Sequence, residues 1–122
     1  QKKELVFLIE QQKLDHSRQN AKVFSRLDGD FHAAIHTIAG NAMCRMIIRD
    51  VRMFVDRLRN LSLHRPADLD EILVDHTAIA QALIDEDSRA AEREMNRHMD
   101  RVDRVAKTLI AQYPEYFERA DV

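Results

Sequence analysis

The stretch RLDGDFHAAIHTIAGN, residues 26–41, indicates an amphipathic α-helix that ends at a glycine. Successive side chains of a helix turn by about 100°, so residues four apart are neighbours on one face. One face of this helix is apolar and carries Phe24, Leu27, Phe31, Ile35 and Ile38. Gly40 suits the left-handed position just after a helix, and Asn41 can cap the next one. We therefore expect a helix from about residue 22 to 39, followed directly by another.

Four further segments show the same helical spacing of apolar residues. They cover residues 2–18, 41–60, 69–84 and 89–112. The breaks between segments fall at Asn20, in LSLHRPAD (61–68) and in DEDS (85–88), which offers helix caps. Pro66 stands at or just before the start of the fourth helix, Asp68 is available as its N-cap, and Pro114 ends the fifth.

The composition favours long helices joined by short links. The chain has 122 residues, of which 45% are hydrophobic, but only 2 Gly and 2 Pro. So few turn residues exclude an all-β fold, and the length suits one domain with a sizeable core. We predict an all-α fold, an antiparallel bundle of about five helices that spans residues 1–122 as a single domain.

The apolar stripes also predict which residues are buried. In the third segment, the stripe consists of Cys44, Ile47, Ile48, Val51, Phe54, Val55 and Leu58. We expect Cys44 to be a small core residue. The continuous apolar block at residues 5–9 predicts burial of the first helix on more than one side. In the tail YPEYFE, residues 113–118, the aromatic rings are expected to lie back on the bundle.

Charge and cysteine content narrow the function classes. The net charge is -2, and 19 basic residues are interspersed with 21 acidic ones, so this piece is a poor candidate for nucleic-acid binding. One cysteine cannot form an internal disulfide, which fits a reducing cytoplasm. No apolar run is long enough to cross a membrane. The chain begins at Gln1 within helical sequence, so we expect a fragment of a longer protein.

Polar residues interrupt the apolar stripe of the opening helix at four-residue steps. Asp28 flanks the stripe, His32 lies slightly further round, and His36 lies roughly 40° closer to solvent. Asp28 and His32 can therefore point into the bundle together. We expect His36 to point away from it.

Two more histidines occupy positions where a leucine would be expected. His76 falls between Ile72 and Ile79 on the apolar stripe of the fourth helix. His98 falls between Met95 and Val102 on that of the fifth. A buried imidazole must form a hydrogen bond or bind a metal, because an unsatisfied buried polar group costs about 1 to 3 kcal/mol.

Asp28, His32, His76 and His98 together offer one carboxylate and three imidazoles from three helices. This donor set suits Zn²⁺, Ni²⁺ or Mn²⁺. On an octahedral ion, two positions would remain for a carboxylate ligand or water. The alternative is that the histidines are hydrogen-bonded core residues, and the spacing alone leaves both interpretations open. His16 and His64 are expected to be a helix-end and a loop residue without a functional role.

Four passages resemble the C-terminal effector-binding domain, called FCD, of the FadR subgroup of GntR-type bacterial transcription regulators. They are LDGDFHAAIHTIAGN, VDHTAIAQALIDED, SRAAEREMNRHMDRV and YPEYF. The similarity extends over essentially the whole chain. Asp75 stands where the family usually has Glu, and Met99 where it has Leu.

The resemblance implies a helical bundle that binds one divalent metal ion through Asp28, His32, His76 and His98. It also implies a homodimer and an N-terminal winged helix-turn-helix for DNA, which this sequence lacks, together with the bundle's first helix. The domain would then sense a small carboxylate effector at the metal and control DNA binding, without catalysis or membrane contact. Arg45, Arg49 and Arg52 are candidates to bind the effector, although their period also fits a solvated or subunit-facing edge.

Three alternatives remain beside the sensor hypothesis. A metal-dependent hydrolase or lyase would use a metal-bound water, but only Asp30 or His36 is available as a general base, and both are expected to point away. A diiron bundle needs paired Glu-x-x-His helices, which the sequence lacks. A metal-free helical sensor with structural core histidines is the third.

Overall fold

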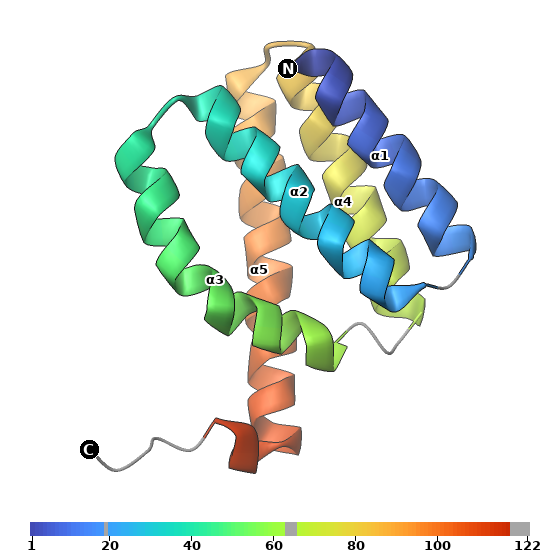
Figure 1. Cartoon of the computed structure of the whole chain (residues 1–122), viewed down its shortest axis with the longest axis vertical. Helices are drawn as coiled ribbons and strands as arrows, with labels where there is room; N and C mark the ends of the chain where they lie inside the picture. The colour runs from blue at the N-terminus through green and yellow to red at the C-terminus, as the bar shows by residue number, and fades with distance from the viewer. Residues whose placement is uncertain (19, 63–65, 118–122) are drawn as a thin grey trace.

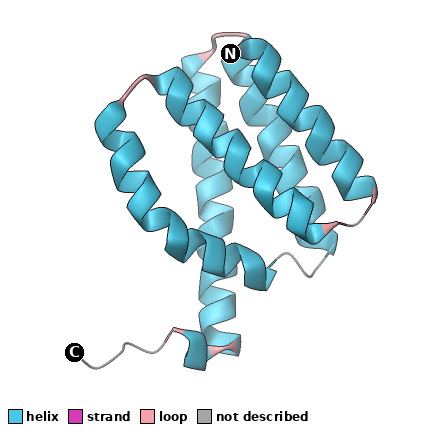
Figure 2. Cartoon of the chain, viewed as in Figure 1, coloured by secondary structure: helices cyan, strands magenta, loops and turns pink. Residues whose placement is uncertain are grey.

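The computed structural model describes residues 1–18, 20–62 and 66–117. Its elements are the helices α1 (Lys2–Ser17), α2 (Ala21–Ala39), α3 (Ala42–Ser62), α4 (Pro66–Ile84) and α5 (Ser88–Gln112), and the short 3-10 helix η1 (Pro114–Tyr116). Figure 2 shows helices and their connections, with no strand in the described ranges. The prediction of an all-α bundle is therefore confirmed.

Side-chain caps begin three of these helices. In each, a side-chain oxygen accepts a hydrogen bond from the backbone amide three residues later. The pairs are Asn20 with Val23 (3.2 Å), Asn41 with Cys44 (3.1 Å) and Asp87 with Ala90 (2.9 Å). Between α2 and α3, Gly40 has φ +68°, a left-handed conformation in which a Cβ would be strained. The predicted break at Gly40 and the caps from Asn41 and from DEDS are thus confirmed, because each depends only on neighbouring residues.

The prediction that Pro66 lies at or just before the start of the fourth helix is confirmed, whereas the predictions of Leu69 as its first residue and Asp68 as its N-cap are wrong. α4 begins at Pro66, three residues before the expected Leu69, so Asp68 lies in the first turn and is not the N-cap. Proline is well suited to the first helical position, since its missing N–H would have no partner within the helix there.

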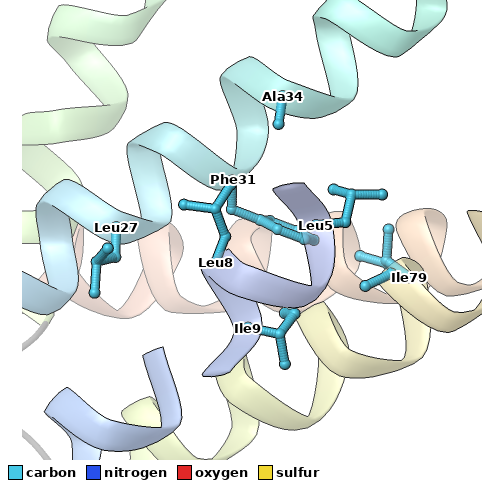
Figure 3. Packing of buried hydrophobic residues seen from close by; sticks show 8 residues of the cluster. Leu5, Leu8, Ile9, Leu27, Phe31, Ala34 and Ile79 are labelled. Atoms are coloured by element: carbon cyan, nitrogen blue, oxygen red, sulfur yellow. The ribbon is translucent and has the colours of Figure 1, made fainter. Parts of the chain in front are cut away.

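The core is formed where α1, α2 and α4 meet, and α5 packs on α4 (Figure 1). Side chains from α1, α2 and α4 point toward one another, as Figure 3 shows for Leu5, Leu8, Ile9, Leu27, Phe31, Ala34 and Ile79. Phe31 is completely buried, and Ile79 is almost so. The predicted apolar face of the second helix contributes Leu27 and Phe31 to this core, whereas its Phe24 packs in a separate cluster with Leu69 of α4.

The apolar stripe of α3 is mostly exposed, contrary to prediction. α3 contacts α2 and α5 and stands apart from α1 in Figure 1. Ile47 is 58% exposed, Val51 is exposed as well, and Cys44 is not a core residue. Leu58 is buried as expected, whereas the side chains of Phe54 and Val55 lie outside the described part. The stripe lacks a second helix to cover it within the described residues.

The first helix and the tail also depart from the expected burial. Val6 and Phe7 are exposed, Phe7 by 59%, so α1 is buried on one side only. Tyr113 and Tyr116 are exposed and contact each other, and the tail approaches the bundle where the carbonyl oxygen of Tyr116 accepts a hydrogen bond from Arg57. No helix in the described ranges combines the length and apolar character needed to cross a bilayer.

Candidate metal centre

Three histidines from three helices meet at one point of the bundle. His32 comes from α2, His76 from α4 and His98 from α5. One ring nitrogen of each lies within 4.8 Å of the corresponding atoms of the other two. The ring centroids are 5.1 Å apart for His32 and His76, and 4.9 Å for His76 and His98. The structure thus brings together the three histidines that the sequence proposed as ligands.

Asp28 lies beside this cluster and is buried. Its Oδ1 atom is 3.4 Å from Nε2 of His76 and 3.9 Å from Nε2 of His32. One carboxylate oxygen therefore faces two of the three imidazoles. The four proposed ligands form one group, while their role as ligands stays a prediction.

The tautomer of His76 follows from a hydrogen-bond chain that starts in α1. The side-chain NH₂ group of Gln12 donates to the backbone carbonyl of Leu27 at 3.2 Å, so its amide oxygen points the other way. That oxygen lies 2.9 Å from Nδ1 of His76, which must therefore be the donor. The lone pair of the neutral ring is then on Nε2, the atom that faces Asp28. Phe31 stacks on the same ring at 4.3 Å and holds its plane.

His98 is oriented in the same manner by Asp75. The Oδ2 atom of this completely buried carboxylate lies 3.4 Å from Nδ1 of His98. Asp75 is held in turn by Arg101, whose Nε donates to Oδ2 at 2.8 Å, and by Arg97, whose guanidinium lies 3.3 Å from Oδ1. With Nδ1 directed at Asp75, Nε2 is the nitrogen that His98 can offer to a metal.

The charges around Asp75 are balanced by ion pairs. Arg101 also contacts Glu71, so it bridges two carboxylates of α4. Burial alone would lower the pKa of Arg101, but its hydrogen bonds to Asp75 and Glu71 outweigh that effect and raise the pKa above its ordinary value. Arg101 therefore stays charged, and Asp75 keeps its counter-ion.

Gln12 and Asp75 were not among the residues predicted for the site from the sequence. Gln12 continues the buried spacing of Leu5, Leu8 and Ile9, so a polar residue on that stripe was the available signal. Asp75 was noticed only as a departure from the family pattern. Metal-ligating histidines usually donate their second ring N–H to such a group, and this arrangement is what the two residues provide.

The residues present fit a divalent ion. Three imidazoles and one carboxylate form a common donor set for zinc and related transition metals. Ligands at about 2.1 Å from an ion lie roughly 3 to 4 Å from one another, so modest side-chain movements from the observed spacing would close the set. The buried partners at Nδ1 of His76 and His98 already aim the other nitrogens inward.

A cavity of about 710 Å³ opens beside the histidines. Asp28, His32 and His98 belong to its wall, whereas His76 lies behind them. Arg45 and Arg49 of α3 also line it, so both candidate effector-binding residues face the same space as the histidines. The side chain of Arg52 lies outside the described part of the chain.

His36 does not point away as expected, because it too lines this cavity. It is not one of the three histidines whose ring nitrogens come together in the described structure. His16 links α1 to α4 through a contact of 2.6 Å between Nε2 and Asp70. His64 lies outside the described residues.

Comparison with known proteins places the chain in a regulatory context. A family model described as the FCD domain matches residues 1–101. The HTH-type transcriptional repressor RspR of Escherichia coli K12 is 26% identical over 109 residues, which is 89% of this chain and 48% of that protein. The uncharacterized HTH-type transcriptional regulator YdfH of Shigella flexneri matches equally well. The chain thus spans about half the length of these curated relatives. No solved structure gives a significant match.

Proposed function

Because the chain belongs to the FCD domain family, we propose that it is the metal-dependent effector-sensing domain of a bacterial transcription regulator. A small organic acid would bind at a divalent metal ion and control DNA binding by a separate N-terminal helix-turn-helix domain. The observation that carries this proposal is the convergence of three imidazoles and a buried carboxylate at the wall of a large cavity.

Asp28, His32, His76 and His98 would hold the ion. Gln12 and Asp75 keep the Nδ1 protons of two rings engaged, so these rings present Nε2 without a change of tautomer. The bound ion would act as a Lewis acid with open positions for carboxylate oxygens or water. Zinc, nickel and manganese all accept this donor set, and availability in the cell would decide among them.

The acid would bind in the cavity between the histidines and α3. Arg45 and Arg49 supply positive charge from the α3 side, which favours an anionic ligand. The walls of this cavity come from α2, α3, α4 and α5, so a ligand there contacts most of the bundle. The ligand would shift the equilibrium between two bundle shapes that differ in the position of α3. The size of this shift is set by the difference in the ligand's affinity for the two shapes.

This shift is the signal that a homodimer would pass to its DNA-binding domains. The chain itself has a net charge of -2, so DNA contact is assigned to the other part of the protein. Both relatives named above are helix-turn-helix regulators, which supports a role in transcription and a site in the cytoplasm. The proposed role is binding without turnover.

The proposal is tested by thermal shift with the purified domain. Protein stripped of metal is loaded with Zn²⁺, Ni²⁺ or Mn²⁺ and then screened against small carboxylic acids. We expect stabilisation by metal, further stabilisation by an acid only in the loaded protein, and neither effect in His98→Ala. Acid binding that is identical with and without metal would overturn metal dependence, and turnover of an ester or sugar acid would favour a hydrolase or lyase.

A further inference from the structure

The surface of the cavity beyond the histidines is predominantly apolar. Its hydrocarbon side chains come from four helices and include Ile35, Ile48, Val51, Ile72, Met95, Met99 and Val102. Those of α5, Met95, Met99 and Val102, lie within about one helical turn of His98. A ligand anchored at the histidines would therefore place the rest of its body against hydrocarbon.

Several polar residues of the wall are already committed to protein partners. Arg101 is paired with Asp75 and Glu71, and the hydroxyl of Thr37 donates to the carbonyl of Ala33 at 3.0 Å. The other polar residues of the wall, which include His36, Arg45, Arg49 and Asp68, account for a small part of its surface, so most hydroxyl groups of a ligand would face hydrocarbon. Each ligand hydroxyl placed there would lose hydrogen bonds to water.

The size of the cavity points in the same direction. A volume of about 710 Å³ lies within the range typical of pockets for drug-sized ligands. An acid of two or three carbons would leave most of the apolar wall in contact with water. A hydrocarbon extension would cover that wall, and each buried methylene increases affinity by about fourfold.

We infer that the effector is a monocarboxylic acid with a medium-length hydrocarbon body, and that polyhydroxylated acids are poor ligands. This inference rests on the proposed function, since the carboxylate anchor is the metal. It adds what the metal site alone cannot specify, because the histidines recognise the carboxylate whereas the apolar wall selects the body attached to it.

The test is calorimetric titration of the Zn²⁺-loaded domain with acetate, butanoate, hexanoate and octanoate. We expect affinity to rise by about fourfold per methylene along the series. Gluconate, with the same number of carbon atoms as hexanoate and the same carboxylate, should bind much more weakly. The two acids differ in the hydroxyl groups on the carbon chain, so their ratio measures the selectivity of the wall.

A pair of methionine variants locates the effect. Met99 lines the cavity and is 51% exposed, so Met99→Gln should fold while adding a polar group to the wall. We expect it to weaken octanoate binding severalfold and to leave acetate binding unchanged. The control is Met53→Gln, because Met53 is 82% exposed and lies outside the cavity wall.

The outcomes separate the two proposals. Tighter binding of gluconate than of hexanoate, or an affinity that does not change with chain length, would overturn the apolar-body inference and leave metal-dependent sensing intact. Absence of bound Zn²⁺ by elemental analysis would overturn the proposed metal site whatever the chain-length series shows. A dimer in sedimentation that excludes octanoate would mean that a second copy fills the cavity, which also contradicts the inference.

Discussion

The two sides of this bundle treat similar apolar stripes in opposite ways. Where α1, α2 and α4 meet, Phe31 and Ile79 are buried and the core is closed. On α3, an equally regular stripe leaves Ile47 and Val51 exposed, Ile47 by 58%. Helical periodicity predicts that a face is apolar, but burial requires a neighbouring helix, and in the described part of the chain α3 packs mainly against α2 and α5.

The candidate site lies on the boundary between the closed and the open side. His76 is completely buried and stacks on Phe31, whereas His32 and His98 reach the cavity that α3 helps to enclose. The closed side therefore holds the nitrogens of the proposed metal site in place, and the open side leaves room for the effector that we propose. A rigid anchor beside an adaptable wall is the arrangement that a sensor needs.

The largest expected effect comes from breaking the closed side at Asp75. Asp75→Ala removes the partner of His98 and leaves Arg101 with one carboxylate fewer. Loss of one member of a buried ion pair typically costs about 3 to 5 kcal/mol, so we expect a fall in unfolding free energy near that size. Urea denaturation measures it, and Asp103→Ala, which removes an exposed pair with Lys107, serves as the control. A loss no larger than the control's would contradict the role given to Asp75.

Removal of the metal should produce the next largest effect. An ion bound only by the folded state stabilises it by about 2.7 kcal/mol when its free concentration is 100 times the dissociation constant. Chelation should therefore lower the melting temperature, and adding Zn²⁺ should restore it. The same treatment should leave a His76→Ala variant unchanged. An unaltered transition in the wild type after verified metal removal would favour purely structural histidines.

Gln12 tests the closed side from the opposite end of the hydrogen-bond chain. Gln12→Met keeps the approximate size of the side chain but deprives His76 of its acceptor and Leu27 of its donor. We expect a loss of about 1 to 3 kcal/mol in stability and about 10- to 100-fold in metal affinity. Metal titration followed by thermal denaturation measures both. Gln81→Met is the control, since Gln81 is exposed and bonds only to Asp85 among the described contacts; equal metal affinity in the two variants would exclude a positioning role for Gln12.

The smallest effect is expected on the open side. Ile47 belongs to the α3 stripe and is 58% exposed, so Ile47→Gln should change the unfolding free energy by less than about 0.5 kcal/mol. Urea denaturation at two protein concentrations measures this change in unfolding free energy. A loss of several times that size, or one that depends on concentration, would show that the α3 stripe is covered in solution and that the contrast between the two sides is smaller than it looks.

The parts of the fold that the sequence predicts correctly depend on local chemistry. The turn at Gly40 and Asn41 follows from φ preference and capping, which involve only adjacent residues. The exposure of Cys44 and Phe7 could not be predicted in this way, because it depends on which helices pack beside α3 and α1. Periodicity contains no information about a neighbour that is distant in the sequence.

The same distinction applies to the site. The positions of His76 and His98 on apolar stripes indicated that they would be buried, and both are. Their partners could not be found from spacing, since Gln12 and His76 are 64 residues apart in the chain. Which nitrogen each ring offers became evident only from contacts between helices.

Elemental analysis of the purified domain, with wild type, His98→Ala and His36→Ala compared side by side, tests the proposed metal centre most directly. His36 lines the cavity but stands outside the histidine cluster, so it controls for the loss of an imidazole near the site. We expect one divalent ion per chain in the wild type and in His36→Ala, and almost none in His98→Ala. Equal metal content in all three proteins, or no metal in any of them after exposure to Zn²⁺, Ni²⁺ and Mn²⁺, would contradict the assignment of the site.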